Sequence, residues 1–122
     1  MRDIRLEERP FEFAGRTYKL RCNMNVLADV QNAFGGAIAG ALNGEDPTRS
    51  VLEFLAAMMN DYADEMGWDE RFTARQLGRK LPLYVTRELD IMGLVTRSIT
   101  PPDAVSEADT ENEADRPEAS GN

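Results

Sequence analysis

The side chains that most often perform acid–base, nucleophilic or metal chemistry are scarce in this sequence. It contains no histidine, which is the commonest general base near neutral pH and the commonest metal ligand. Zinc sites and Ser-His or Cys-His nucleophile pairs are therefore excluded within one chain. The single cysteine, Cys22, cannot form an internal disulfide, so it fits a reducing compartment or, as the alternative, a link between two chains.

A group of carboxylates offers a second kind of chemistry. Asp61, Asp64 and Glu65, followed by Asp69 and Glu70, could hold a hard cation through their oxygens. They lack the Asp-x-Asp-x-Asp-Gly spacing of an EF-hand loop. The pattern is instead typical of a solvated helix end.

Two further features are also explained better by structure than by catalysis. Gly35-Gly36 and Gly40 are not followed by the Gly-Lys-Ser/Thr of a phosphate-binding loop, and they predict a helix end and a flexible joint. Glu88 is a lone carboxylate among apolar positions, and we expect it to reach solvent or to pair with an arginine. The sequence thus predicts no enzyme, no catalytic residue, no metal site and no cofactor.

Charge divides the 122 residues into two parts. The net charge is −8, and residues 101–122 hold seven acidic residues against one basic residue. This segment also contains three prolines and only one sizeable aliphatic residue, Val105. It cannot bury enough apolar surface to offset the entropy lost on ordering. We expect a folded domain over residues 1–100 and a disordered acidic tail over residues 101–122.

Composition also bears on location and partners. No apolar run of about 18 residues is present, and the first residues do not resemble a signal peptide. We therefore expect no membrane association and a cytoplasmic location. The nearly balanced charge of residues 1–100 and the acidic tail argue against binding to a phosphate backbone, so we expect no nucleic-acid partner.

Period-two alternation from Arg9 to Met24 predicts a β-hairpin. In its first half, Phe11 and Phe13 fall on one face. The apolar residues of its second half fall on another face; these are Tyr18, Leu20 and Cys22. The turn lies at Ala14-Gly15, a weaker turn pair than Asn-Gly. Because an isolated hairpin is marginally stable in water, its aromatic face must pack against helices or a partner.

About four helices follow the hairpin, which makes the predicted fold mainly α. Capping residues, apolar periodicity and Gly or Pro stops place them at residues 26–34, 47–66, 74–80 and 83–99. Asn25 is the expected N-cap of the first helix. Asp46-Pro47 or Ser50-Glu53 begins the second, and Thr73 opens the third with a capping box. The small residues 36–44 are interpreted as a linker, with one loose helical turn at residues 37–42 as the alternative.

Two of these helices carry apolar stripes that are candidates for binding a partner. On the helix at 47–66 the stripe spans about 160°, so this helix is either the central core helix or partly faces another chain. Methionines suit surfaces that adapt to varied apolar partners, although they also fill cores. The candidate partner-binding residues are Phe54, Met58, Met59, Tyr62, Met66, Leu89, Met92 and Val95.

The helices at 74–80 and 83–99 also allow a helix-turn-helix interpretation. The basic residues that cluster there are Arg71, Arg75, Arg79 and Lys80. The last helix offers few donors for base edges, since only Arg87 and Arg97 lie among its aliphatic residues. Amphipathic packing helices explain the pattern better, and a small DNA-binding regulator is the less favoured alternative.

Three segments carry a resemblance to a known family. They are the hairpin from Phe11 to Arg21, the segment from Asn23 to Gly35 with its Asn-x-Asn-x-Leu and Phe-Gly elements, and the segment from Thr73 to Gly78. In this order they resemble the tail assembly chaperones of long-tailed bacteriophages and related tail-like particles. The resemblance covers residues 9–99.

The resemblance implies a small, mainly helical, non-enzymatic protein of the host cell cytoplasm. Such a protein binds the apolar, helical tape measure protein and keeps it soluble until tail-tube subunits polymerise around it. In several members a programmed ribosomal frameshift gives a longer product whose extension recruits the tail tube protein. We also expect a homo-oligomer. A permanent structural head-tail or tail component remains the alternative from another class, because it would have the same composition.

Overall fold

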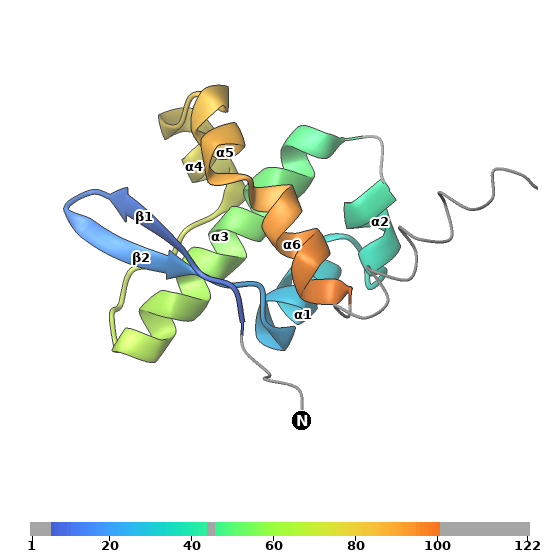
Figure 1. The fold of residues 1–122 in the computed structure, drawn as a ribbon, viewed down its shortest axis with the longest axis horizontal. Coiled ribbons are helices and arrows are strands. Elements are labelled where there is room, and N and C mark those ends of the chain that lie inside the picture. The colour runs from blue at the N-terminus through green and yellow to red at the C-terminus, as the bar shows by residue number, and fades with distance from the viewer. Residues whose placement is uncertain (1–5, 44–45, 101–122) are drawn as a thin grey trace, which may run out of the picture.

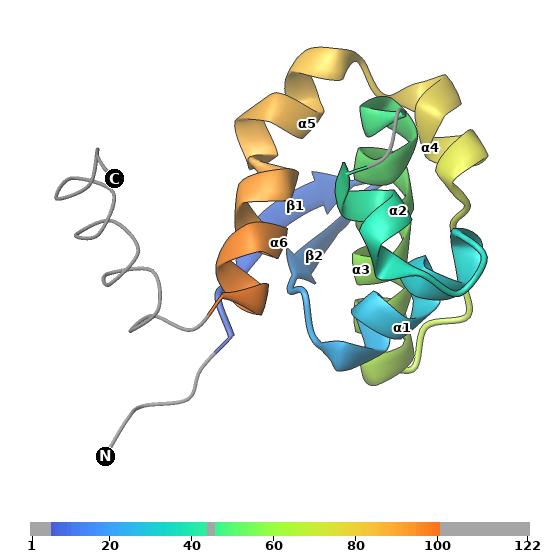
Figure 2. The ribbon, with the colours of Figure 1, turned by 90° about the vertical axis from the view of Figure 1, so that its right-hand side faces the viewer.

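A computed structural model describes residues 6–43 and 46–100 (Figures 1 and 2). The fold is mainly helical with an N-terminal antiparallel hairpin, as the sequence predicts. Its elements are β1 (Arg9–Phe13), β2 (Arg16–Leu20), α1 (Met24–Ala33), α2 (Ile38–Asn43), α3 (Pro47–Met66), α4 (Ala74–Lys80), α5 (Leu83–Leu89) and α6 (Ile91–Ile99). The predicted acidic tail over residues 101–122 lies outside the described residues.

The hairpin presents its apolar residues on a single face. The strand register pairs Phe11 with Tyr18, and residues directly opposite each other in an antiparallel pair point to the same side. The prediction of two separate apolar faces is therefore wrong. Phe11, Tyr18 and Leu20 are buried, and β2 packs against α3. The hairpin thus covers one side of the central helix.

The hairpin turn can be improved by one substitution. Ala14 and Gly15 have φ angles of 53° and 83°, the positive values that a type I′ turn needs and that alanine adopts only with strain. Asparagine tolerates this conformation, so Ala14→Asn is expected to raise the free energy of unfolding by about 0.5–1 kcal/mol. Urea denaturation measures the change. Ala14→Val, which is β-branched, is expected to lower the stability, and equal stability of both variants would contradict this account.

The first helical region differs from the prediction at two places. Asn23, rather than Asn25, is the N-cap of α1, and its side chain accepts a hydrogen bond from the Val26 amide at 2.9 Å. The amide group of Asn23 also donates to Asp61 at 2.7 Å, which connects the start of α1 to α3. The segment interpreted as a linker contains the short helix α2, which matches the alternative of a helical turn there.

Helix α3 is the centre of the fold (Figures 1 and 2). Asp46 caps it by accepting from the Arg49 amide at 3.0 Å, Pro47 occupies the first turn, and Gly67 ends it with φ 76°. β2, α1, α2, α4 and α6 all contact it. Because it is covered from several directions, six consecutive residues in its middle are buried; they are Phe54, Leu55, Ala56, Ala57, Met58 and Met59. The structure shows α3 as the central core helix, while Val51 and Leu52 near its start stay partly exposed.

The predicted helix at 83–99 is two helices. Asp90 adopts a left-handed conformation with φ 53° and ψ 51°, which ends α5 and precedes α6. Its carboxylate lies against Gly93, where a Cβ atom would collide with it, and pairs with Arg97 at 3.4 Å. The break turns α5 away from α6, so the predicted apolar arc is not continuous. Glu88, the lone carboxylate among the apolar positions of this segment, is exposed.

Candidate functional site: an apolar groove beside helix α5

The predicted partner-binding residues separate into a buried and an accessible group. The buried group consists of Phe54, Met58, Met59, Tyr62 and Val95, which are 0–9% exposed. These five side chains form the domain's own core and offer no surface in this fold. Their burial follows from the central position of α3 and from the packing of α6 on it.

The accessible group consists of Met66, Leu89 and Met92. Met66 is 49% exposed at the C-terminal end of α3, whereas Leu89 and Met92 are half-buried near the joint between α5 and α6. The most exposed apolar side chains of α5 lie at its start and are not among the candidates. They are Leu83 and Tyr84, at 57% and 62%. The structure therefore moves the candidate surface to α5.

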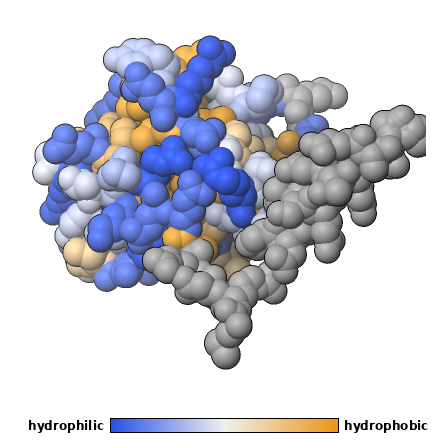
Figure 3. Space-filling model, viewed as in Figure 1, coloured by the Kyte–Doolittle hydropathy of each residue, from blue (hydrophilic) through white to orange (hydrophobic). Residues whose placement is uncertain are grey.

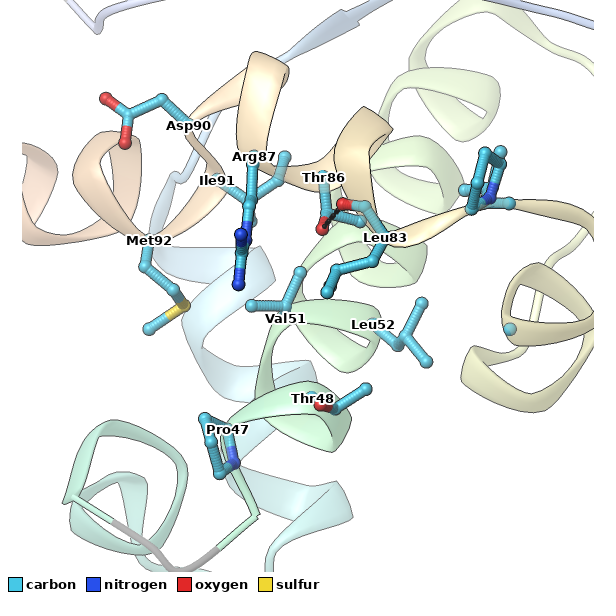
Figure 4. A pocket seen from close by; sticks show the side chains of 13 residues that line it. Pro47, Thr48, Val51, Leu52, Leu83, Thr86, Arg87, Asp90, Ile91 and Met92 are labelled. Atoms are coloured by element: carbon cyan, nitrogen blue, oxygen red, sulfur yellow. Dashed lines mark hydrogen bonds between the residues drawn. The ribbon is translucent and has the colours of Figure 1, made fainter.

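A groove of about 500 Å³ lies between α5 and the first half of α3 (Figure 4). Figure 4 shows Val51, Leu52 and Thr48 on the α3 side, with Leu83 and Thr86 opposite them. Ile91 and Met92 of α6 close one end, and Leu81 and Gly78 belong to the α4 side. The lining is mainly apolar, which is typical of sites that receive apolar side chains of a ligand or partner.

Few polar groups reach this groove. Thr86 is satisfied internally, since its hydroxyl donates to the Leu83 carbonyl at 2.8 Å. Arg87 extends its guanidinium along the groove, whereas the carboxylate of Asp90 points away from it (Figure 4). No acidic side chain among the described residues forms an ion pair with Arg87. The groove is thus apolar with one available cation on its wall.

The outer surface around α5 is mixed in character. On the face shown in Figure 3, hydrophilic residues dominate, and apolar residues gather in the upper part of the view around the position of α5. α5 makes only sparse contact with the other elements. The apolar side chains of this region therefore lack the cover that surrounds α3.

A second hollow of about 520 Å³ adjoins the groove between the start of α3 and α4. The two hollows share Thr48, Leu52 and Gly78. The wall of the second one holds three arginines, Arg49, Arg75 and Arg79, against two acidic residues, Asp46 and Glu53, so it is basic on balance. Arg49 pairs with Glu53 at 3.7 Å, while Arg75 and Arg79 form no ion pair with the described residues.

The structure also bears on the residues considered for chemistry. Cys22 is 2% exposed, and its burial raises the pKa of the thiol to about 11. A link between two chains through Cys22 would require this part of the core to open. Within residues 6–43 and 46–100, no group of three or more cysteine or acidic residues is arranged to hold a metal ion. No helix in the described part of the chain is long and apolar enough to cross a membrane.

The residues of the groove were only partly visible in the sequence. Val51 and Leu52 are apolar residues of the predicted helix at 47–66, and Arg75 and Arg79 of the adjoining hollow belong to the basic cluster in the sequence. These residues form one site only because the chain breaks at Asp90, which places α5 beside the start of α3. The apolar periodicity of the sequence does not indicate that Asp90 has a positive φ angle.

No protein-family model, curated protein or solved structure matches this chain.

Proposed function

We propose that this protein is a non-enzymatic tail assembly chaperone of a long-tailed bacteriophage, which binds the tape measure protein and keeps it soluble during assembly. The resemblance of the hairpin, of α1 and of the segment from Thr73 to Gly78 to that family motivates the proposal. A permanent structural head-tail or tail component is the alternative.

The observation that supports this proposal best is the apolar groove beside α5. A chaperone of an amphipathic helical client needs an accessible apolar surface that receives side chains at i, i+3, i+4 and i+7. The groove has apolar walls from α3, α5 and α6. Leu83 lines it and is exposed, and Tyr84, the next residue of α5, is exposed as well. The client surface proposed here is this groove, in place of the buried stripe of α3.

The net charge of the chain fits the same function. A complex between this chain and an apolar client would expose apolar surface of both, and like charge on each bound copy opposes aggregation. The chain carries −8 in total. The acidic residues of 101–122 supply most of that excess.

Co-expression tests the proposal directly. Together with the tape measure protein of the same genome, the full chain is expected to keep that client in the soluble fraction and to co-purify with it. Leu83→Ser with Tyr84→Ser is expected to reduce the recovered client at least about fivefold, because each buried anchor contributes more than about 1 kcal/mol at a typical interface. Both residues are exposed, so the fold is expected to persist.

Met24→Ser is the matched control. Met24 is 82% exposed on α1, away from the groove, and its substitution is expected to leave client recovery unchanged. A client that stays insoluble and does not co-purify with the full chain would overturn the proposal.

Mass spectrometry of purified particles separates the chaperone from the structural component. A chaperone is expected to be absent from the finished particle, whereas a component must be present in stoichiometric amount. Retention on DNA that falls steeply with salt would favour the regulator instead.

A further inference from the structure

We infer that the apolar groove and the basic hollow beside it form one continuous docking site, and that its occupant is an amphipathic helix with acidic residues flanking its apolar stripe. This inference rests on the proposed function and specifies the chemistry of the client. The client helix is expected to place apolar side chains against α3, α5 and α6 and its carboxylates against α4.

The continuity of the two hollows depends on Gly78. This residue lies on α4 and lines both hollows. A Cβ atom at Gly78 would approach Cδ1 of Leu52 to 3.2 Å, so a side chain there would stand in the passage above Leu52. Glycine inside a helix costs about 1 kcal/mol relative to alanine. The open passage is the feature that a larger residue would remove.

Charge complementarity selects the occupant. Arg75 and Arg79 are exposed at the α4 end, and Arg87 extends along the apolar end. None of the three forms an ion pair with the described residues. The acidic residues that line the two hollows are engaged elsewhere: Glu53 pairs with Arg49, Asp90 pairs with Arg97, and Asp46 accepts the Arg49 backbone amide as the cap of α3. The site therefore combines apolar walls with available cations, which match an apolar stripe bordered by carboxylates.

Synthetic peptides test this inference on the full chain. Two helical peptides of about 20 residues share one leucine stripe at i, i+3, i+4 and i+7 and differ in their flanking positions, which are glutamate in one and lysine in the other. Fluorescence anisotropy at low salt measures both affinities. The glutamate peptide is expected to bind about tenfold more tightly, because the ion pairs at the rim become repulsions in the lysine peptide.

Three variants locate the effect. Arg79→Glu is expected to remove most of the preference for the glutamate peptide. Lys19→Glu makes the same change of charge at an exposed residue of β2 and is expected to retain the preference. Gly78→Phe is expected to weaken both peptides about tenfold by filling the passage, and its circular dichroism spectrum checks that the fold is kept.

The possible failures are distinct. Equal binding of both peptides, or equal effects of Arg79→Glu and Lys19→Glu, would overturn the acidic occupant while the co-expression result still decides the chaperone function. Neutralising Glu107, Asp109, Glu111 and Glu113 with the corresponding amides tests the chain's own acidic segment as a rival occupant. A tenfold gain in affinity for the glutamate peptide in that variant would assign the basic hollow to residues 101–122 and overturn the inference.

Discussion

Phe54→Ala is expected to lower the free energy of unfolding by about 3–5 kcal/mol, the range found when a buried phenylalanine is truncated. Phe54 is fully buried at the middle of α3, where the hairpin and the surrounding helices leave the cavity little room to collapse. Stabilities of small domains lie at about 5–15 kcal/mol, so this one substitution removes a large share. Urea denaturation of the full chain measures the loss.

Met66→Ala provides the control on the same helix. Met66 belongs to the same sequence stripe but is 49% exposed, and its truncation is expected to cost less than about 1 kcal/mol. A small effect at both positions would show that the middle of α3 is not the core and would return Phe54 to the candidate partner surface.

Alkaline pH is expected to destabilise the fold through Cys22. The pKa of this thiol rises from 9.0 to about 11 because burial disfavours the thiolate. Below pH 9 the thiol is neutral in both states, and its burial is fully tolerated. Between pH 9 and 11 the unfolded chain ionises while the folded chain does not, so stability falls with rising pH. The loss from this group reaches about 2–3 kcal/mol near pH 11.

Comparison with Cys22→Ala isolates this contribution. Burial also raises the pKa of Tyr18, so ionisation of Tyr18 adds a further loss of stability at alkaline pH in both proteins. The test therefore compares the slope of the free energy of unfolding against pH between the native chain and the variant. The stability of the variant is expected to fall less steeply between pH 9 and 11. Equal slopes would exclude Cys22 as the cause. In the native chain at pH 7, labelling of the thiol by a disulfide reagent is expected to be slow and to become rapid in urea.

Local signals in the sequence predicted much of the fold. The capping box at Thr73 is present. The backbone N–H of Gln76 donates to the Thr73 hydroxyl at 3.1 Å, and the backbone N–H of Thr73 donates to the side-chain oxygen of Gln76 at 3.0 Å. Asp46-Pro47 and Gly67 likewise mark the ends of α3. Such features are decided within a few residues, so the sequence suffices for them.

Features that depend on tertiary packing are harder to predict from the sequence. Apolar periodicity identifies the side of a helix that avoids water, but not whether the chain itself or a partner covers it. The small residues Ala56, Ala57 and Ala63 are buried as well, and they allow neighbours to approach α3 on the sides outside its large apolar stripe. The break at Asp90 depends on the contacts of its carboxylate with Gly93 and Arg97, which lie outside the reach of a helical wheel.

The candidate site shows the same limit. Each wall of the groove belongs to a predicted helix, yet the hollow exists only because α5 lies over Val51 and Leu52. Arg75 and Arg79 were recognised as a cluster, and their lack of acidic partners became visible only with the positions of Glu53 and Asp90.

The start of the hairpin and the end of α6 lie side by side. Glu7, just before β1, receives hydrogen bonds from Arg97 near the end of α6 at 2.8 and 2.9 Å, and Arg9 donates to the Leu89 carbonyl. Cargo joined directly at residue 6 or at residue 100 would therefore be tethered beside the last turn of α6. Helix α5 ends where α6 begins, at the opposite end of α6 (Figure 1). Such cargo would therefore leave the groove accessible, and two cargoes joined at both positions would crowd each other.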